Sequence, residues 1–220
     1  MRYIVFDLEF TVNRKQQYLS EIIEIGAIEL YEDENGVAFM TDLFQTYVMP
    51  VRETTLTKMT LDFTGITQQQ IDNAPNFATA VEQFRDWLGG EDYYLCAWGP
   101  DDKIQFVRQC QAAGLEISWI RNYNDIQLQF TRLQGGDVGQ RISLKKALRH
   151  ADITMLGKHH NALDDAFNTA KLFVRVKPQL VLELNNAAED SLNMTKIVYS
   201  SGDDDNKPFS QLAQLLGMVI

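Results

Sequence analysis

Tyr3-Ile4-Val5-Phe6-Asp7-Leu8-Glu9 is an apolar run that ends in two acidic residues. The run is apolar at odd and even positions alike, which predicts a central strand covered on both faces. Asp7 and Glu9 are two residues apart, so on a strand their side chains point to the same face. A solvated strand end is the alternative interpretation. Unpaired acids closing a buried strand are costly, so we expect these two to have a partner.

The elements that follow predict an α/β fold. Strands are expected at residues 3–8, 21–31, 39–48 and 93–98, with a fifth near 117–123, and Asn35-Gly36 suits the turn of a hairpin. Helices are expected at residues 67–70, 77–88, 101–113, 126–133, 143–151 and 162–176. Three antiparallel strands, then strands alternating with helices, predict a mixed sheet with helices on both faces. We place the core domain at residues 1–177 and a C-terminal extension at 178–220, where apolar residues from Phe209 onward could form a helix face.

Composition excludes several classes of protein. The chain has 220 residues, 20 Lys and Arg against 30 Asp and Glu, and a net charge of −10, which argues against a protein that coats long duplexes. The two cysteines have no metal-site spacing, which fits a reducing compartment. The first apolar run is too short for a signal peptide or a membrane span, so we expect a cytoplasmic protein without membrane contact.

Two further acids are candidates for a site with Asp7 and Glu9. Asp102 follows Trp98-Gly99-Pro100-Asp101; we expect Asp101 to cap the next helix and Asp102 to face the sheet edge, although the doublet leaves the assignment open. On the helix from residue 162, Asp165 falls at about 300°, inside the apolar arc. Asp164 falls on the polar side with Asn168, and we expect it at the surface.

Four carboxylates with one histidine indicate a particular chemistry. Carboxylate oxygens suit Mg²⁺ or Mn²⁺ rather than zinc. A histidine beside them is suited to act as a general base, so the set points to metal-assisted phosphodiester hydrolysis. His160 precedes the helix that carries Asp165. His159 competes with it for this role.

Basic residues gather just before these histidines. Between Arg141 and His160 there are five basic residues and one acid, Asp152. An ordinary solvated helix face explains such a segment equally well. Its position beside His160 favours the alternative, a strip that follows a phosphate backbone.

Four segments together resemble a known family, the DEDD-type 3′–5′ exonucleases, in the subgroup with histidine in the last motif. They are Phe6-Asp7-Leu8-Glu9-Phe10-Thr11, Glu21-Ile22-Ile23-Glu24-Ile25-Gly26-Ala27, Trp98-Gly99-x-x-Asp102, and His160-x-Ala162-Leu163-Asp164-Asp165-Ala166. Gly65-Ile66-Thr67-Gln68 also resembles a segment of that family. The match runs from about residue 3 to 176 and looks closest to the histone-mRNA-exonuclease branch.

The resemblance implies a ribonuclease-H-like domain that removes 5′ mononucleotides from single-stranded 3′ ends, with RNA favoured over DNA. It implies that two Mg²⁺ or Mn²⁺ ions bind Asp7, Glu9, Asp102 and Asp165, and that Glu9 and His160 are catalytic. Leu8, Phe10 and Thr11 would contact the terminal nucleotide, with core packing as the alternative. Two other functions stay open: a proofreading partner of a DNA polymerase, and an inactive binding module on the same fold.

Overall fold

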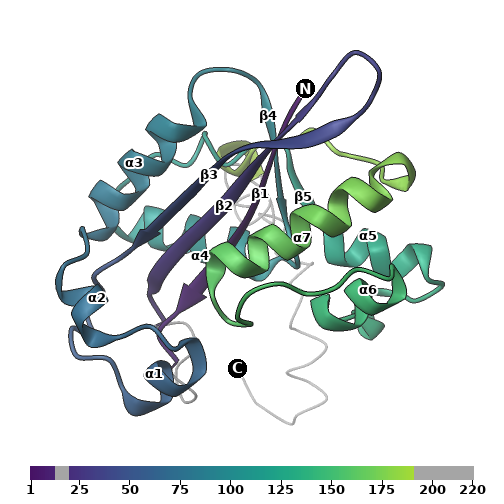
Figure 1. Cartoon of the computed structure of the whole chain (residues 1–220). Helices are drawn as coiled ribbons and strands as arrows, with labels where there is room; N and C mark the ends of the chain where they lie inside the picture. The colour runs from purple at the N-terminus through teal and green to yellow at the C-terminus, as the bar shows by residue number, and fades with distance from the viewer. Residues whose placement is uncertain (13–19, 191–220) are drawn as a thin grey trace, which may run out of the picture.

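Five strands form one mixed sheet in the order β3-β2-β1-β4-β5 in a computed structural model, which describes residues 1–12 and 20–190 (Figure 1). β1 pairs antiparallel with β2 and parallel with β4; β2–β3 is antiparallel and β4–β5 parallel. The strands are β1 (Arg2–Phe10), β2 (Ile22–Glu32), β3 (Ala38–Tyr47), β4 (Tyr93–Ala97) and β5 (Tyr123–Asp125). The predicted mixed five-stranded sheet is confirmed.

Most of the helices lie where the sequence predicts them. They are α1 (Lys58–Thr64), α2 (Gln68–Asp72), α3 (Phe77–Leu88), α4 (Asp101–Ala112), α5 (Ile126–Leu133), α6 (Leu144–His150) and α7 (Ala162–Val176), with short 3₁₀ turns at Val138–Gln140 and Lys177–Gln179. α1 was not predicted, although Thr57 caps its start and Gly65 ends it with φ +72°. None of the helices in the described ranges is long and apolar enough to cross a membrane.

The fifth strand differs from its prediction. It begins at Tyr123 and ends at Asp125, whereas the apolar segment 117–123 favoured a strand there. Ile117, Trp119 and Ile120 are instead buried in a turn that packs into the core. The burial of these side chains, rather than strand pairing, accounts for the apolar pattern.

β1 divides the core into two layers. Ile4, Phe6 and Leu8 pack towards α3 and α4, while Tyr3 and Val5 pack towards α7. Figure 1 shows α7 crossing one face of the sheet while α3 and α4 cover the other. Because side chains alternate along a strand, the acids at odd positions of β1 continue the row that faces α7.

α7 approaches the sheet closely at Gly26 on β2, which pairs with Asp7 of β1. A Cβ atom at residue 26 would lie 2.6 Å from the Cα of Leu163 and closer still to its amide nitrogen. Only a glycine leaves room for the first turn of α7 at this point.

The chain after α7 continues along the edge of β5. The backbone carbonyl of Asn185 accepts a hydrogen bond from the Asn122 amide at 2.7 Å, and Ala187 is buried beside Ile120. The described part of the extension, up to residue 190, therefore packs on the domain that precedes it. The helix face expected from Phe209 onward lies outside the described residues, and the boundary at residue 177 stays a prediction.

Replacing Gly26 by alanine is expected to destabilise the protein by roughly 1–3 kcal/mol, the usual effect of overpacking, because the new methyl group would overlap the backbone of α7. Urea denaturation followed by circular dichroism measures this change. Gly90→Ala is the matched control, since a Cβ at Gly90 meets nothing within 4 Å. Equal stability of the two variants would contradict the close approach of α7.

Candidate active site

Three carboxylates from two elements converge on one face of the sheet. Asp7 and Glu9 come from β1, and Asp165 comes from the first turn of α7. One carboxylate oxygen of each lies within 4.8 Å of the others. Glu9 and Asp165 are buried, and Asp7 is partly buried. We call these three residues the carboxylate cluster; the structure thus brings together acids that are 158 positions apart in sequence.

Asp102 reaches β1 from the first turn of α4. Its Oδ1 accepts a hydrogen bond from the Leu8 amide at 3.1 Å, and the side chain is buried, while Asp101 is exposed. This confirms that Asp102 is the member of the doublet that faces the sheet. The expected cap by Asp101 is wrong: α4 starts after Pro100 without a side-chain cap, and both acids belong to its first turn.

The electrostatics of the cluster favour a cation. Burial raises the pKa of Asp7 well above its ordinary value, and the neighbouring charges of Asp102 and Glu9 raise it further. Burial, with Glu24 and Asp165, raises the pKa of Glu9 to about 8. Burial also raises the pKa of Asp102. Buried carboxylates repel one another because little water is present to screen their charges, and a divalent cation among them would relieve that repulsion. The donor set therefore fits Mg²⁺ or Mn²⁺.

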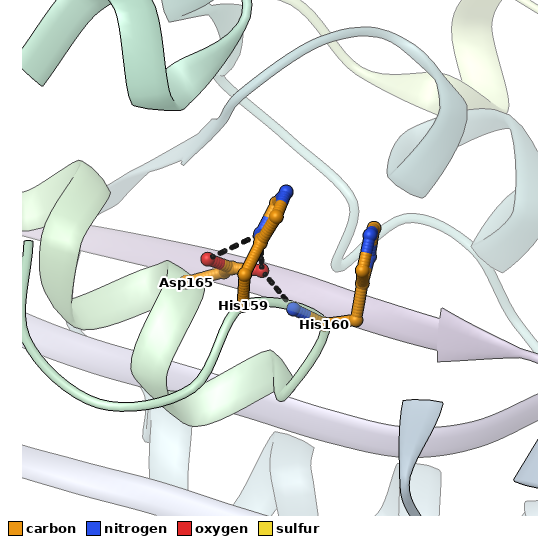
Figure 2. A group of neighbouring side chains, drawn as sticks. All are labelled: His159, His160 and Asp165. Carbon is orange, nitrogen blue, oxygen red and sulfur yellow. Dashed lines mark hydrogen bonds and ion pairs between the residues drawn. The ribbon is translucent and has the colours of Figure 1, made fainter. Parts of the chain in front are cut away.

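Two histidines meet Asp165 in different ways (Figure 2). Nδ1 of His159 lies 3.0 Å from Oδ2 of Asp165, while His160 contacts the same oxygen through its backbone N–H at 2.9 Å. The His160 ring stacks on the His159 ring and contacts the Phe63 ring at a tilt, with each ring centroid 4.0 Å away. Each histidine still has a ring nitrogen within 4.8 Å of Asp165.

The backbone of His160 is unusual, because its φ is +64°. This left-handed conformation is uncommon for a residue other than glycine and is held here by the bond between its amide and Asp165. The turn allows His160 to donate its N–H to the carboxylate while its ring stacks on Phe63 of α1. The loop that carries His159 and His160 thus meets α1 beside the cluster.

Glu24 of β2 was not predicted as part of the site, yet it fixes the start of α7. Its carboxylate is fully buried and accepts hydrogen bonds from the Ala162 amide at 3.1 Å, the Asn161 side chain at 3.1 Å and the Gln45 side chain at 2.6 Å. A carboxylate at a helix N-terminus also interacts favourably with the helix dipole. The sequence signal was a single acid within the apolar segment Ile22-Ile23-Glu24-Ile25-Gly26-Ala27.

The expected surface position of Asp164 is wrong. Asp164 is partly buried and accepts a hydrogen bond from the Lys158 amide at 2.8 Å, and Asn168 is fully buried. The cause is the segment before α7, which folds back along this face of the helix: the Asn168 side chain bonds both the amide and the carbonyl of Leu156. The helix angles placed the residues correctly, but a loop covers the side expected to face solvent.

The three residues expected to contact substrate lie close to the cluster in sequence but differ in exposure. Leu8 is buried on the opposite face of β1, in the core layer under α3 and α4. Thr11 is buried, and its hydroxyl accepts a hydrogen bond from the Glu21 amide at 3.0 Å. Phe10 is partly buried against the same core layer. The Phe10 ring is therefore the one of these three that retains exposed surface.

Comparison with known proteins identifies the family. A family model described as exonuclease, of the RNase_T type, matches residues 4–173. The chain belongs to this exonuclease family. Proteins of the DEDD group within it generally depend on divalent metal ions, which agrees with the donor set of the cluster.

Individual relatives support the same assignment. The 3′–5′ exonuclease crn-4 of Caenorhabditis elegans is 29% identical over 185 residues, covering 79% of this chain and 62% of that protein. A PolC-type DNA polymerase III of Thermotoga maritima is 28% identical over 177 residues, which is 79% of this chain but 12% of the polymerase. The crystallographic nuclease domain of 3′hExo, a DEDDh family member bound to rAMP, has a TM-score of 0.74 and 26% identity over 84% of this chain and 96% of that domain. The ribonuclease-H-like fold is confirmed.

The raised pKa of Glu9 makes the stability of the metal-free protein depend on pH. A carboxyl whose pKa rises from 4.5 to about 8 on folding holds its proton in the folded state, so it stabilises the fold below pH 4.5 and loses that contribution as pH approaches 8. In EDTA, the melting temperature should fall more between pH 6 and pH 8 than it does in Glu9→Gln. Mn²⁺ should raise the melting temperature more at pH 8 than at pH 6, because metal ligands bind deprotonated. Equal pH slopes for the two proteins would contradict this.

Proposed function

We propose that this chain is a divalent-metal-dependent 3′–5′ exonuclease that releases 5′ mononucleotides from single-stranded nucleic acid. The observation that carries the proposal is the carboxylate cluster, where Asp7, Glu9 and Asp165 converge in a buried site beside two histidines. A module that only bound nucleic acid would gain nothing from gathering acids near phosphates. The names of crn-4 and 3′hExo also support hydrolysis that starts at the 3′ end.

Asp7, Glu9, Asp102 and Asp165 would hold two Mg²⁺ or Mn²⁺ ions. Such ions, when bound, lower the pKa of water and stabilise negative charge on a departing oxygen. Asp102 and Glu24 support the site from outside the cluster: Asp102 bonds the backbone of β1, and Glu24 holds the start of α7. These bonds keep Asp7, Glu9 and Asp165 in position while a substrate exchanges for product.

His160 is the proposed general base, which takes the proton from the attacking water. Burial and the neighbouring His159 lower the pKa of His160, while Asp165 opposes the shift, so the ring is neutral near pH 7 and able to accept a proton. Its ring contacts Phe63 and His159 by stacking, which leaves its nitrogens available. His159 is the competing candidate, because its ring nitrogen already contacts Asp165.

RNA is the favoured substrate, because the 3′hExo domain binds a ribonucleotide and shares the fold over most of this chain. Phe10 and the backbone around Leu8 and Thr11 are proposed to contact the terminal nucleotide. The match to a PolC-type polymerase keeps a proofreading role as the second candidate. A strong preference for mismatched DNA ends, or co-purification with a polymerase, would favour that second role.

Incubation with matched 5′-labelled single-stranded RNA and DNA in Mg²⁺ or Mn²⁺ is expected to shorten both from the 3′ end and to release 5′ mononucleotides. RNA should be shortened faster. EDTA should abolish the reaction, and so should Asp165→Asn, whereas Asp164→Asn keeps an acceptor for Lys158 and should retain most activity. Attack from the 5′ end, or unchanged activity in EDTA, would contradict the proposed function.

Replacing His160 by alanine should lower kcat by roughly 10²–10⁴-fold, the usual contribution of a general base, while Mn²⁺ affinity stays near that of the wild type. His159→Ala should affect kcat much less. Single-turnover rates and Mn²⁺ titration calorimetry separate the two effects. If His159→Ala were the inactive variant and His160→Ala the active one, the base would be the histidine whose ring contacts Asp165.

A further inference from the structure

α6 carries a basic surface that the proposed chemistry does not use. Leu144, Ala147 and Leu148 are buried against α5 and α7, and the opposite side of the helix exposes Lys145, Lys146 and Arg149. We call these three exposed residues the basic face of α6. The helix contains no acid. Within residues 1–12 and 20–190, every ion pair involves other side chains, such as Arg141 with Asp125.

The loop between the basic face and the histidines is hydrogen-bonded along α7. Residues 151–161 run back along this helix: Lys171 bonds the Thr154 carbonyl at 2.7 Å, Asn168 bonds Leu156, and Asp164 bonds the Lys158 amide. In Figure 1, α6 and this loop lie on the same side of the sheet as α7. α6 packs on Leu172, seven residues from Asp165, which is roughly 10 Å along a helix.

Lys158 supplies a further cation between α6 and the histidines. It is exposed and takes part in no ion pair of the described residues. Its ammonium lies beside Gly65, where α1 ends, and Phe63 of the same helix contacts the His160 ring. Positive charge is therefore present beside the histidines and again about two helical turns along α7.

We infer that the basic face of α6 binds the phosphate backbone of the single-stranded substrate upstream of the nucleotide being removed. The inference rests on the proposed function and adds the path of the strand. A chain with net charge −10 repels nucleic acid over most of its surface, so three exposed cations close together, without an ion pair among the described residues, are where a phosphate backbone gains most. Proteins that bind single-stranded nucleic acid commonly use a positively charged groove that follows the backbone, together with aromatic side chains on which bases stack.

The test uses the full chain with substrates of two lengths. Lys145→Ala/Lys146→Ala/Arg149→Ala keeps good helix formers at exposed positions, so the fold should persist. With a 12-nucleotide RNA, the plot of log(kcat/KM) against log[KCl] should become shallower by about 2, which is about 0.7 for each lost phosphate contact on a single strand. KM should rise at low salt while kcat stays constant. A dinucleotide, whose one internucleotide phosphate is the one being cleaved, should show neither change.

Gln83→Glu/Arg85→Glu is the matched control. It makes the same change in net charge on exposed positions of α3, which covers the other face of the sheet, and should leave the salt dependence unaltered. The inference is overturned if the α6 variant behaves like the wild type or the control, or if the dinucleotide and the 12-mer lose activity equally. Failure of the proposed function is separate: wild type would then show no metal-dependent release, and anisotropy of the labelled 12-mer in EDTA would still report whether α6 contributes to binding.

Discussion

The active site depends on the close contact between the first turn of α7 and β2. Gly26 leaves space for the helix backbone, and two residues away the buried carboxylate of Glu24 bonds the first amide of the helix and its cap, Asn161. These two residues lie directly across the strand pair from Asp7 and Glu9. β2 therefore sets both the distance of α7 from the sheet and the rotation of α7 about its own axis, and with them the position of Asp165. The loop with both histidines is bonded to the same helix, so it is positioned along with it.

Without a bound cation, the carboxylates of the cluster repel one another. Acids whose pKa values are raised by burial and mutual repulsion are held together by packing that is formed elsewhere, in the two core layers on either side of β1. Sites of this kind commonly bind cations, because folding has already placed the carboxylate ligands together before a cation binds. The core thus holds together the carboxylates that we propose as metal ligands.

Much of the fold followed from local patterns. The apolar run in β1 and the periodicity of α3 and α7 were sufficient to predict these elements, because burial of their side chains appears directly in the sequence pattern. The hairpin was predicted from its turn residues. Asp165 was located by its angle on α7, and Asp102 was favoured over Asp101 mainly by the resemblance of Trp98-Gly99-x-x-Asp102 to a family motif. Three features needed tertiary information. The loop that covers Asp164 and Asn168 is close to them in sequence, but no sequence pattern shows that it folds back over this face of α7. The turn around Trp119 resembles a strand because burial alone makes it apolar. Glu24 became significant only once α7 was seen to pack on it.

The arrangement of the cluster also fixes when the site can form during synthesis. Asp7 leaves the ribosome early, while Asp165 follows some 158 residues later, and α7 must then dock on β2 before the acids meet. Domains assemble as units once their chain is complete. A nascent chain therefore cannot complete the carboxylate cluster until nearly the whole domain has been translated. A growing polypeptide, still attached to the message that encodes it, carries the parts of a nuclease without its active site.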